Sequence, residues 1–347
     1  MFQPYNHYEQ PPLPFACPSC LHYGTGRCQG PVSYETYTMR GPSLISCVDI
    51  ERRQELFNDL YSQVIPIPAS SHQTKINLPA FIPGVEEGMP GVPAFPPNSL
   101  FAVSLETFLR KRGTILFESA DELREKLHLP SDARLALIGT GKDRRIERFW
   151  TTSDKHDVWR RIAEFGFEFV TSLTFSVYDE QPRADQIYNQ DRNCLTHDLF
   201  ARLHVPSIPF LYPYNEEDYS AVFTWLRERP DISKIAVLAQ FYRSDRQFSQ
   251  FLRNMRLIQD GAGRSVQFLV VGVALRHRIE AIMRDFDASI VSVKPFQAAL
   301  HGEMILDDLK ASTAGEQELS QSRPKLVVQN VTTFTSICEE MRDKYRR

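Results

Sequence analysis

The stretch from residue 100 to residue 306 alternates short apolar runs with longer amphipathic stretches, and this alternation constrains the fold more than any other feature. The apolar runs are rich in β-branched and aromatic residues, as is typical of strands buried on both faces of a parallel sheet. Helical patterns such as SADELREKLH and RHRIEAIMRDF separate them. The eight runs are FAVSL (101–105), TILF (114–117), LALIGT (135–140), FVTSLTFSVY (169–178), SIPFLYPY (207–214), KIAVLAQF (234–241), QFLVVGV (267–273) and ASIVSVKP (288–295).

Eight strands, each followed by a helix within roughly 200 residues, fit a (β/α)8 TIM-like barrel in the α/β class. An open doubly wound α/β sheet is the alternative. That fold carries a glycine-rich phosphate loop after its first strand. No such loop follows the first run, and the nearest stretch is GTGKD after the third. The barrel is therefore the favoured prediction.

Two segments flank the predicted barrel of residues 100–306. Residues 1–99 contain clustered cysteines and then a proline-rich passage, IPIPASSHQTKINLPAFIPGVEEGMPGVPAFPPN. Because proline disrupts helix interiors and central strands, we expect this passage to be an ordered wrapping segment or a linker. Residues 307–347 form a C-terminal extension whose amphipathic end, TTFTSICEEMRDKYRR, is expected to pack against the barrel.

The composition is that of a folded, water-soluble chain, with 42% hydrophobic and 24% charged residues. No apolar run approaches the roughly 18 residues that a membrane-spanning helix needs. The N-terminus lacks the basic and apolar regions of a secretory signal. We therefore expect a cytoplasmic protein without a membrane partner. The formal charge of -3 excludes a uniformly basic surface but is compatible with a local basic face.

Four of the six cysteines lie close together, in the spacing Cys17-x2-Cys20-x7-Cys28-x18-Cys47. Thiols stay reduced in the cytoplasm, so such a cluster predicts a metal site. Four thiolates suit a structural zinc ion, and a [4Fe–4S] cluster is the alternative. Four protein ligands leave no open coordination position, which indicates a structural role. Cys194 and Cys338 lie in helical patterns and are expected to pack in the core.

Polar residues that follow the strands are the candidates for chemistry, because all strand-end loops of a barrel share one face. Adjacent acids after long buried strands favour a catalytic role, and cations from three loops favour an anionic ligand. Asp143 has a competing interpretation as a helix cap, and Lys294 as a structural lysine. The predicted catalytic residues are Asp143, Asp179 and Glu180, and the predicted substrate-binding residues are Lys142, Arg144, Arg145, Tyr178, Tyr212, Gln240, Arg243, Arg276 and Lys294.

Three stretches together resemble phage and bacterial proteins related to the tRNA-guanine transglycosylase barrel. They are LIGTGKDRRIERFW, the segment from DRNCLTHDLF to SKIAVLAQF, and FLVVGVALRHRIEAIMRDF with the following VSVKPF. A looser likeness links the chain to bacterial antiviral DNA glycosylases. The resemblance implies cleavage of an N-glycosidic bond on a flipped, modified base in nucleic acid, with DNA expected before RNA.

In transglycosylases an aspartate attacks the sugar while another acid assists the leaving base, and the resemblance assigns these roles to Asp143 and Asp179. The chain has no Asp-Ser-Gly-x-Phe-Gln segment, and its cysteines precede the barrel. Hydrolysis, as by a DNA glycosylase, and base exchange, as by a transglycosylase, therefore both stay open. A different class is a non-catalytic nucleic-acid-binding module that uses the metal knuckle as its contact surface.

Overall fold

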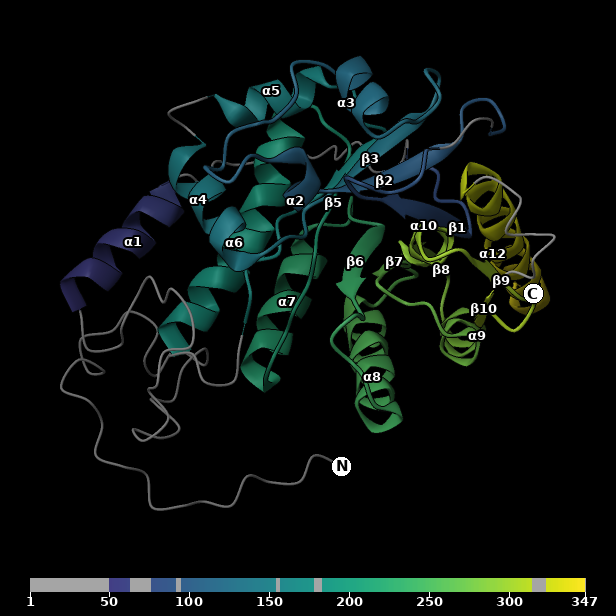
Figure 1. The fold of residues 1–347 in the computed structure, drawn as a ribbon. Helices are drawn as coiled ribbons and strands as arrows, with labels where there is room; N and C mark the ends of the chain where they lie inside the picture. The colour runs from purple at the N-terminus through teal and green to yellow at the C-terminus, as the bar shows by residue number, and fades with distance from the viewer. Residues whose placement is uncertain are drawn as a thin grey trace.

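The computed structural model describes residues 50–62, 76–91, 95–153, 157–177, 183–313 and 323–346. Within these residues, eight parallel strands form one sheet at the centre of the molecule, and helices surround it (Figure 1). The strands are β1 (Phe81–Val85), β2 (Leu100–Ser104), β3 (Arg134–Ile138), β4 (Phe169–Thr171), β5 (Ser207–Ile208), β6 (Lys234–Leu238), β7 (Gln267–Val271) and β8 (Ala288–Ser292).

The strand order is β5-β4-β3-β2-β1-β8-β7-β6, so every strand lies beside its neighbours in sequence and β1 pairs with β8. The two outermost strands of this order, β5 and β6, are joined by a parallel bridge between Phe210 and Ala236. The amide of Ala236 donates to the carbonyl of Pro209 at 2.8 Å across this seam. The sheet is thus a nearly closed, TIM-like barrel, as predicted, and the open doubly wound alternative is wrong.

Helices connect most of the strands and cover the outer face of the barrel. Those between β2 and β8 are α2 (Leu105–Phe108), α3 (Ala120–Lys126), α4 (Asp143–Thr152), α5 (Val158–Glu164), α6 (Arg183–Arg202), α7 (Glu216–Glu228), α8 (Asp245–Ala262) and α9 (Arg276–Asp285). The others are α1 (Ile50–Ser62) before the barrel and α10 (Lys294–Leu300) after it. A small antiparallel pair, β9 (Glu303–Ile305) and β10 (Ala311–Thr313), and the long helix α12 (Arg323–Tyr345) complete the chain.

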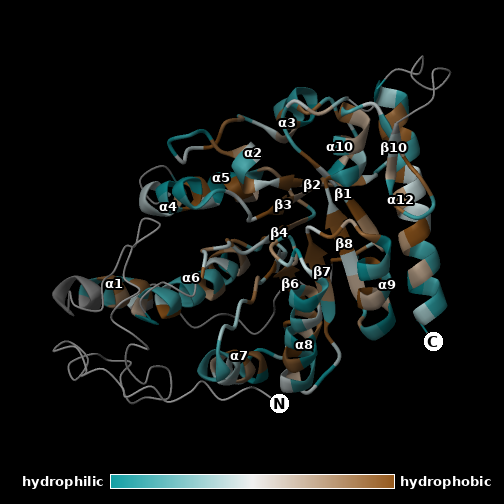
Figure 2. Cartoon of the chain, turned by 60° about the horizontal axis from the view of Figure 1, so that its bottom comes forward, coloured by the Kyte–Doolittle hydropathy of each residue, from teal (hydrophilic) through white to brown (hydrophobic). Residues whose placement is uncertain are grey.

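Side chains alternate between the inside and the outside of the barrel along each strand, as the two-residue period of a strand requires. The interior cluster combines small residues such as Ala102 and Ala136 with the rings of Phe169 and Phe210. The outward-facing residues form a larger core with the helices, and Figure 2 shows the apolar strands enclosed by helices with polar outer faces. The barrel centre is therefore a packed core, and ligands must bind at its rim.

The proline-rich passage contributes a central strand, so the prediction that it excludes one is wrong for residues 81–85. β1 lies between β2 and β8, deep in the sheet. Only Pro83 falls within this strand, and one proline removes a single ladder donor while the neighbouring residues keep theirs. The barrel accordingly begins at residue 81 instead of residue 100.

The run TILF is not a strand of the sheet, which corrects the second of the eight predicted strands. Ile115 forms an isolated antiparallel bridge with Leu109, and Ile115 and Phe117 are buried in the outer core. Their apolar character comes from packing between α2 and α3. The count of eight strands holds because this error offsets the missed β1.

α12 packs across β1, α9 and α10. The centroids of the Phe81 and Phe334 rings lie 4.4 Å apart. Asn330 donates hydrogen bonds to the carbonyl oxygens of Pro295 and Glu303. The described part of the β1–β2 connection holds no helix. α12 therefore covers the outer face of β1 from the other end of the chain.

Candidate active site at the carboxyl ends of the strands

A carboxyl group follows β1 at the mouth of the barrel. Ile82 faces the interior cluster, so Gly84 and Glu86 lie on the same side two and four residues further on. The Glu86 side chain is half-buried. Burial and the neighbouring Glu106 raise its pKa, while Lys142 acts in the opposite direction. Glu86 therefore shares one site with residues that follow β2 and β3.

The carboxylate of Glu106 is held by the loop that follows β3. Its Oε1 lies 3.0 Å from the ammonium of Lys142 and 3.8 Å from the guanidinium of Arg145. Its Oε2 accepts a hydrogen bond from the backbone amide of Lys142 at 3.2 Å. Arg145 also donates to the backbone carbonyl of Glu106 at 2.5 Å. The loop thus binds a carboxylate of the protein itself where a phosphate loop would hold its ligand.

The two glycines of GTGKD allow this close approach. A side chain on Gly139 would collide with the backbone carbonyl of Ser172, and one on Gly141 would lie 3.2 Å from the Cβ of Glu106. The backbone amide of Glu106 in turn donates to the carbonyl of Thr140 at 3.2 Å. The glycines therefore bring β2, β3 and β4 together at the mouth, and the motif is explained by packing.

Asp143, the first residue of α4, is linked to the loop after β4. Its Oδ1 accepts a hydrogen bond from the Ser176 hydroxyl at 2.6 Å, and the Ser176 carbonyl accepts one from Asn189 Nδ2 at 2.6 Å. Asn189 Oδ1 accepts from Arg192, which also binds Glu147 with two hydrogen bonds of 2.7 and 2.8 Å. Asp143 and Glu147 stand one turn apart on the same helix, so a closed polar network fixes Asp143 in place.

The structure places the other predicted binding residues at separate points of the rim. Arg144 and Arg243 are exposed. The backbone of Arg243 donates to Gln247 and accepts from Arg278. Arg276 donates to the carbonyl of Asp307, and Gln240 lies against Gly272 in the neighbouring loop. Lys294 is half-buried at the start of α10. Tyr212, also half-buried, lines a cavity between β5 and β6. Lys142 and Arg145 are thus the predicted cations that contact a carboxylate of the mouth.

Tyr178, Asp179, Glu180 and the four clustered cysteines lie outside the described residues. Within the described part of the chain, no group of three or more histidine, cysteine or acidic residues has the arrangement of a metal site. Cys338 is fully buried and Cys194 packs against the outer core, as predicted. None of the described helices is long and apolar enough to cross a bilayer.

Sequence reasoning missed Glu86 and most of the cavity near Tyr212. Glu86 was overlooked because its strand lies in the proline-rich passage, although two acids after the apolar stretch AFIPGV were a usable signal. Tyr219, Tyr242 and Asn254 line the cavity with Tyr212. Tyr242 follows a predicted strand, whereas Tyr219 and Asn254 lie in helical patterns and carry no local mark of a site.

A basic hollow of about 650 Å³ lies beside the loop after α2. It is lined by Arg110, Lys111 and Arg112 together with Thr114 and Thr152. The three cations are consecutive and exposed. Three adjacent positive charges and two hydroxyl groups are suited to binding phosphate oxygens.

A scan against models of protein families finds no match to this chain, and a search of curated protein sequences finds none either.

Proposed function

We propose that this protein hydrolyses the N-glycosidic bond of a base in nucleic acid, with DNA carrying a modified base as the preferred substrate. The observation that supports this most is the half-buried Glu86 carboxyl at the barrel mouth, beside the ion pair of Glu106 and Lys142. The resemblance of residues 135–300 to transglycosylase-like barrels points to the same bond. Such an activity suits defence against phage DNA that carries modified bases.

In this proposal Glu86 is the general base that activates water. A raised pKa makes a carboxylate a stronger base, which favours general-base catalysis. The water oxygen bonds to the C1′ carbon of the sugar and its proton passes to Glu86. The C1′–N bond breaks, and its electron pair leaves with the base, which takes a proton from solvent. The Glu106 carboxylate stabilises the cationic sugar of the transition state.

Asp143 is the second candidate for contact with the sugar, because it is held at the start of α4 next to Lys142. Asp179 and Glu180 stay predictions of the same kind. The exposed cations Arg110, Lys111 and Arg112 are proposed to bind the phosphate backbone, which predicts that affinity for DNA falls with rising salt.

The test is mass spectrometry of bases released from modified and unmodified phage DNA, with alkali-labile abasic sites measured in parallel. Glu86→Gln is expected to lower the rate by about 100-fold or more, the range of a general base. Glu87→Gln is the matched control, since this exposed neighbour only faces Lys126 at 3.6 Å. Loss of activity in both variants, or in neither, would contradict the assignment. Absence of any released base or abasic site from these DNAs and from RNA would refute the proposed function.

Two variants test the effect of neighbouring charges on the pKa of Glu86, and they should shift the pH profile in opposite directions. Because Glu86 must be ionised, the rate is expected to fall as the pH drops through its pKa. Lys142→Gln removes a charge that lowers this pKa, so the acid limb should move to higher pH. Glu106→Gln removes a charge that raises it, so the limb should move to lower pH. Shifts in the same direction in both variants would exclude Glu86 as the titrating group.

A further inference from the structure

A cavity of about 120 Å³ lies on the side of the barrel away from Glu86, where β5 and β6 part. The residues that follow the bridge between Phe210 and Ala236 on each strand line this cavity. Tyr212 and Leu238 line the cavity from the interior side, and Leu211 and Val237 line it from the outer side. α7 and α8 close it with Tyr219, Asn254, Met255 and other residues. We call this cavity the tyrosine pocket.

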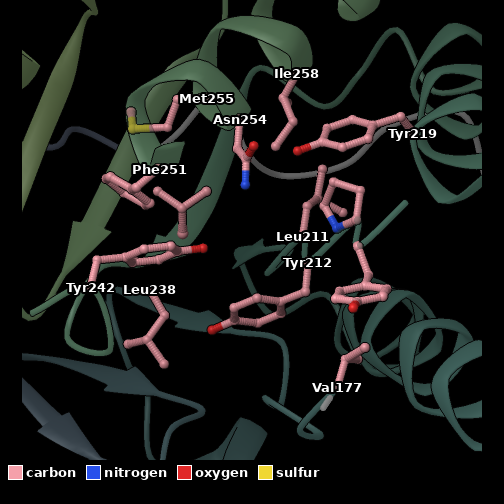
Figure 3. A pocket seen from close by; sticks show the side chains of 13 residues that line it. Val177, Leu211, Tyr212, Tyr219, Leu238, Tyr242, Phe251, Asn254, Met255 and Ile258 are labelled. Carbon is pink, nitrogen blue, oxygen red and sulfur yellow. The ribbon is translucent and has the colours of Figure 1, made fainter. Parts of the chain in front are cut away.

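The polar side chains that line the tyrosine pocket are four phenols, those of Tyr212, Tyr214, Tyr219 and Tyr242, and the amide of Asn254. Figure 3 shows the hydroxyl groups of Tyr219 and Tyr242 and the amide of Asn254 directed toward one central space, with the ring of Tyr212 beside it. The hydroxyl oxygens of Tyr212 and Tyr219 are buried and have no hydrogen-bond partner among the described residues. Tyr219 as a residue is buried, with 6% of its surface exposed.

Buried hydroxyl groups without partners are costly, at about 1–3 kcal/mol each. Two such groups in one cavity, unpaired with any described residue, mark it as a candidate ligand site. Burial raises the pKa of Tyr212 and of Tyr219, so both remain neutral hydrogen-bond donors. None of the thirteen residues that line the pocket carries a charge. A charged ligand would therefore lose its hydration without compensation, and an uncharged one is favoured.

The size and walls of the pocket select the shape of this ligand. An engineered cavity of about 150 Å³ binds benzene, so the 120 Å³ of the tyrosine pocket matches one ring better than a fused pair. Rings of Tyr212, Tyr242 and Phe251 offer faces for stacking, and Met255 adds a polarizable sulfur. These features describe a flat, uncharged single-ring heterocycle with acceptor oxygens.

We propose that the tyrosine pocket binds the base of the flipped nucleotide and selects a single-ring pyrimidine base over a purine. This inference rests on the proposed glycosidic activity. The hydroxyl groups of Tyr212 and Tyr219 would then donate to the base oxygens, on which negative charge develops as the C1′–N bond breaks. Glu86 follows β1, which is opposite β5 in the barrel order, so water would attack from the side away from the leaving base.

The test is a titration of the full-length protein with free uracil, thymine, cytosine, adenine and guanine, in which ligand-observed NMR detects binding. We expect saturable binding of a pyrimidine with a Kd near or below about 1 mM and none of either purine. Tyr219→Phe removes one hydroxyl and keeps the ring, so it should weaken binding about 3- to 10-fold. Asn254→Leu should also weaken it. Tyr345→Phe, whose hydroxyl binds Glu280 on α9 at 2.8 Å, is the matched control and should bind normally.

The possible outcomes test the proposed ligand of the pocket and the proposed activity independently. Pyrimidine binding that Tyr219→Phe weakens, without base release from any nucleic acid, supports the pocket and overturns the proposed function. Release of purines, or base release without binding of a pyrimidine, overturns the pocket and leaves the function standing. Pyrimidine binding that neither Tyr219→Phe nor Asn254→Leu alters would also overturn the pocket, because the ligand would then bind elsewhere.

Discussion

The buried ion pair between Glu147 and Arg192 offers the most direct test of how the site is held together. The Arg192 side chain is only 1% exposed and that of Glu147 is 16% exposed. The guanidinium lies 3.6 Å from the centroid of the Phe175 ring and is buried between α6, which carries it, and Glu147 of α4. Glu147→Ala would leave this charge buried with Asn189 as its remaining side-chain acceptor.

Breaking a buried pair from one side costs about 3–5 kcal/mol, because the remaining charge stays desolvated. We therefore expect Glu147→Ala to lower the free energy of unfolding by this amount in urea denaturation. The double variant Glu147→Leu with Arg192→Met removes both charges at similar volume and should restore most of the loss. Asp121→Ala, which breaks an exposed pair with Arg124, is the control and should leave stability unchanged.

Two results would refute this reasoning. A loss below about 1 kcal/mol in Glu147→Ala would mean that the guanidinium is solvated, as surface pairs are. A double variant as unstable as Glu147→Ala would mean that shape, and not the buried charge, sets the cost. The pair also has a functional consequence, because Asn189 and Ser176 connect Arg192 to Asp143. Destabilisation of the network should therefore reduce activity before the barrel unfolds.

Three further predictions concern pH, packing and metal. Burial lowers the pKa of His197 from 6.5 to about 3, so between these values the unfolded chain binds a proton that the folded chain does not. The free energy of unfolding should therefore fall by about 1.4 kcal/mol for each pH unit below 6.5, and His197→Asn should flatten this slope in denaturation at pH 7 and pH 5. Gly139→Ala places a methyl group against the carbonyl of Ser172 and should cost about 1–3 kcal/mol; an unchanged melting temperature would contradict the close contact. We propose that the purified protein carries about one zinc ion per chain, and that Cys17→Ser with Cys20→Ser loses it; elemental analysis that finds iron and sulfide instead favours the [4Fe–4S] alternative.

The barrel was predictable because its strands are buried on both faces and leave a strong signal. Runs such as KIAVLAQF and QFLVVGV contain almost no polar residue, and each became a strand with four buried positions. TILF shows the limit of this signal, since its buried residues serve the outer core. Periodicity measures burial, and it does not report which layer a residue is buried in.

Individual site residues were harder to predict because their roles depend on contacts between distant segments. The sequence predicts that Lys142 binds an anionic ligand, but its nearest partner is Glu106, 36 positions earlier in the chain. It predicts the same of Arg276, which binds the carbonyl of Asp307. A cation at a strand end is available to a ligand only if the folded protein has not already paired it, and this cannot be seen in a single sequence.

The order of the strands places Glu86 and the tyrosine pocket on opposite sides of the barrel. β1 and β5 are four places apart in a ring of eight, so in this proposal the sugar of the nucleotide would lie over the mouth between them. A base held by Tyr212 and Tyr219 would leave toward β5, and water activated by Glu86 would approach C1′ from the opposite side. In the proposed reaction this would be an inverting hydrolysis, in which base and nucleophile occupy opposite faces of the sugar. We propose hydrolysis on this ground, and base exchange stays the alternative.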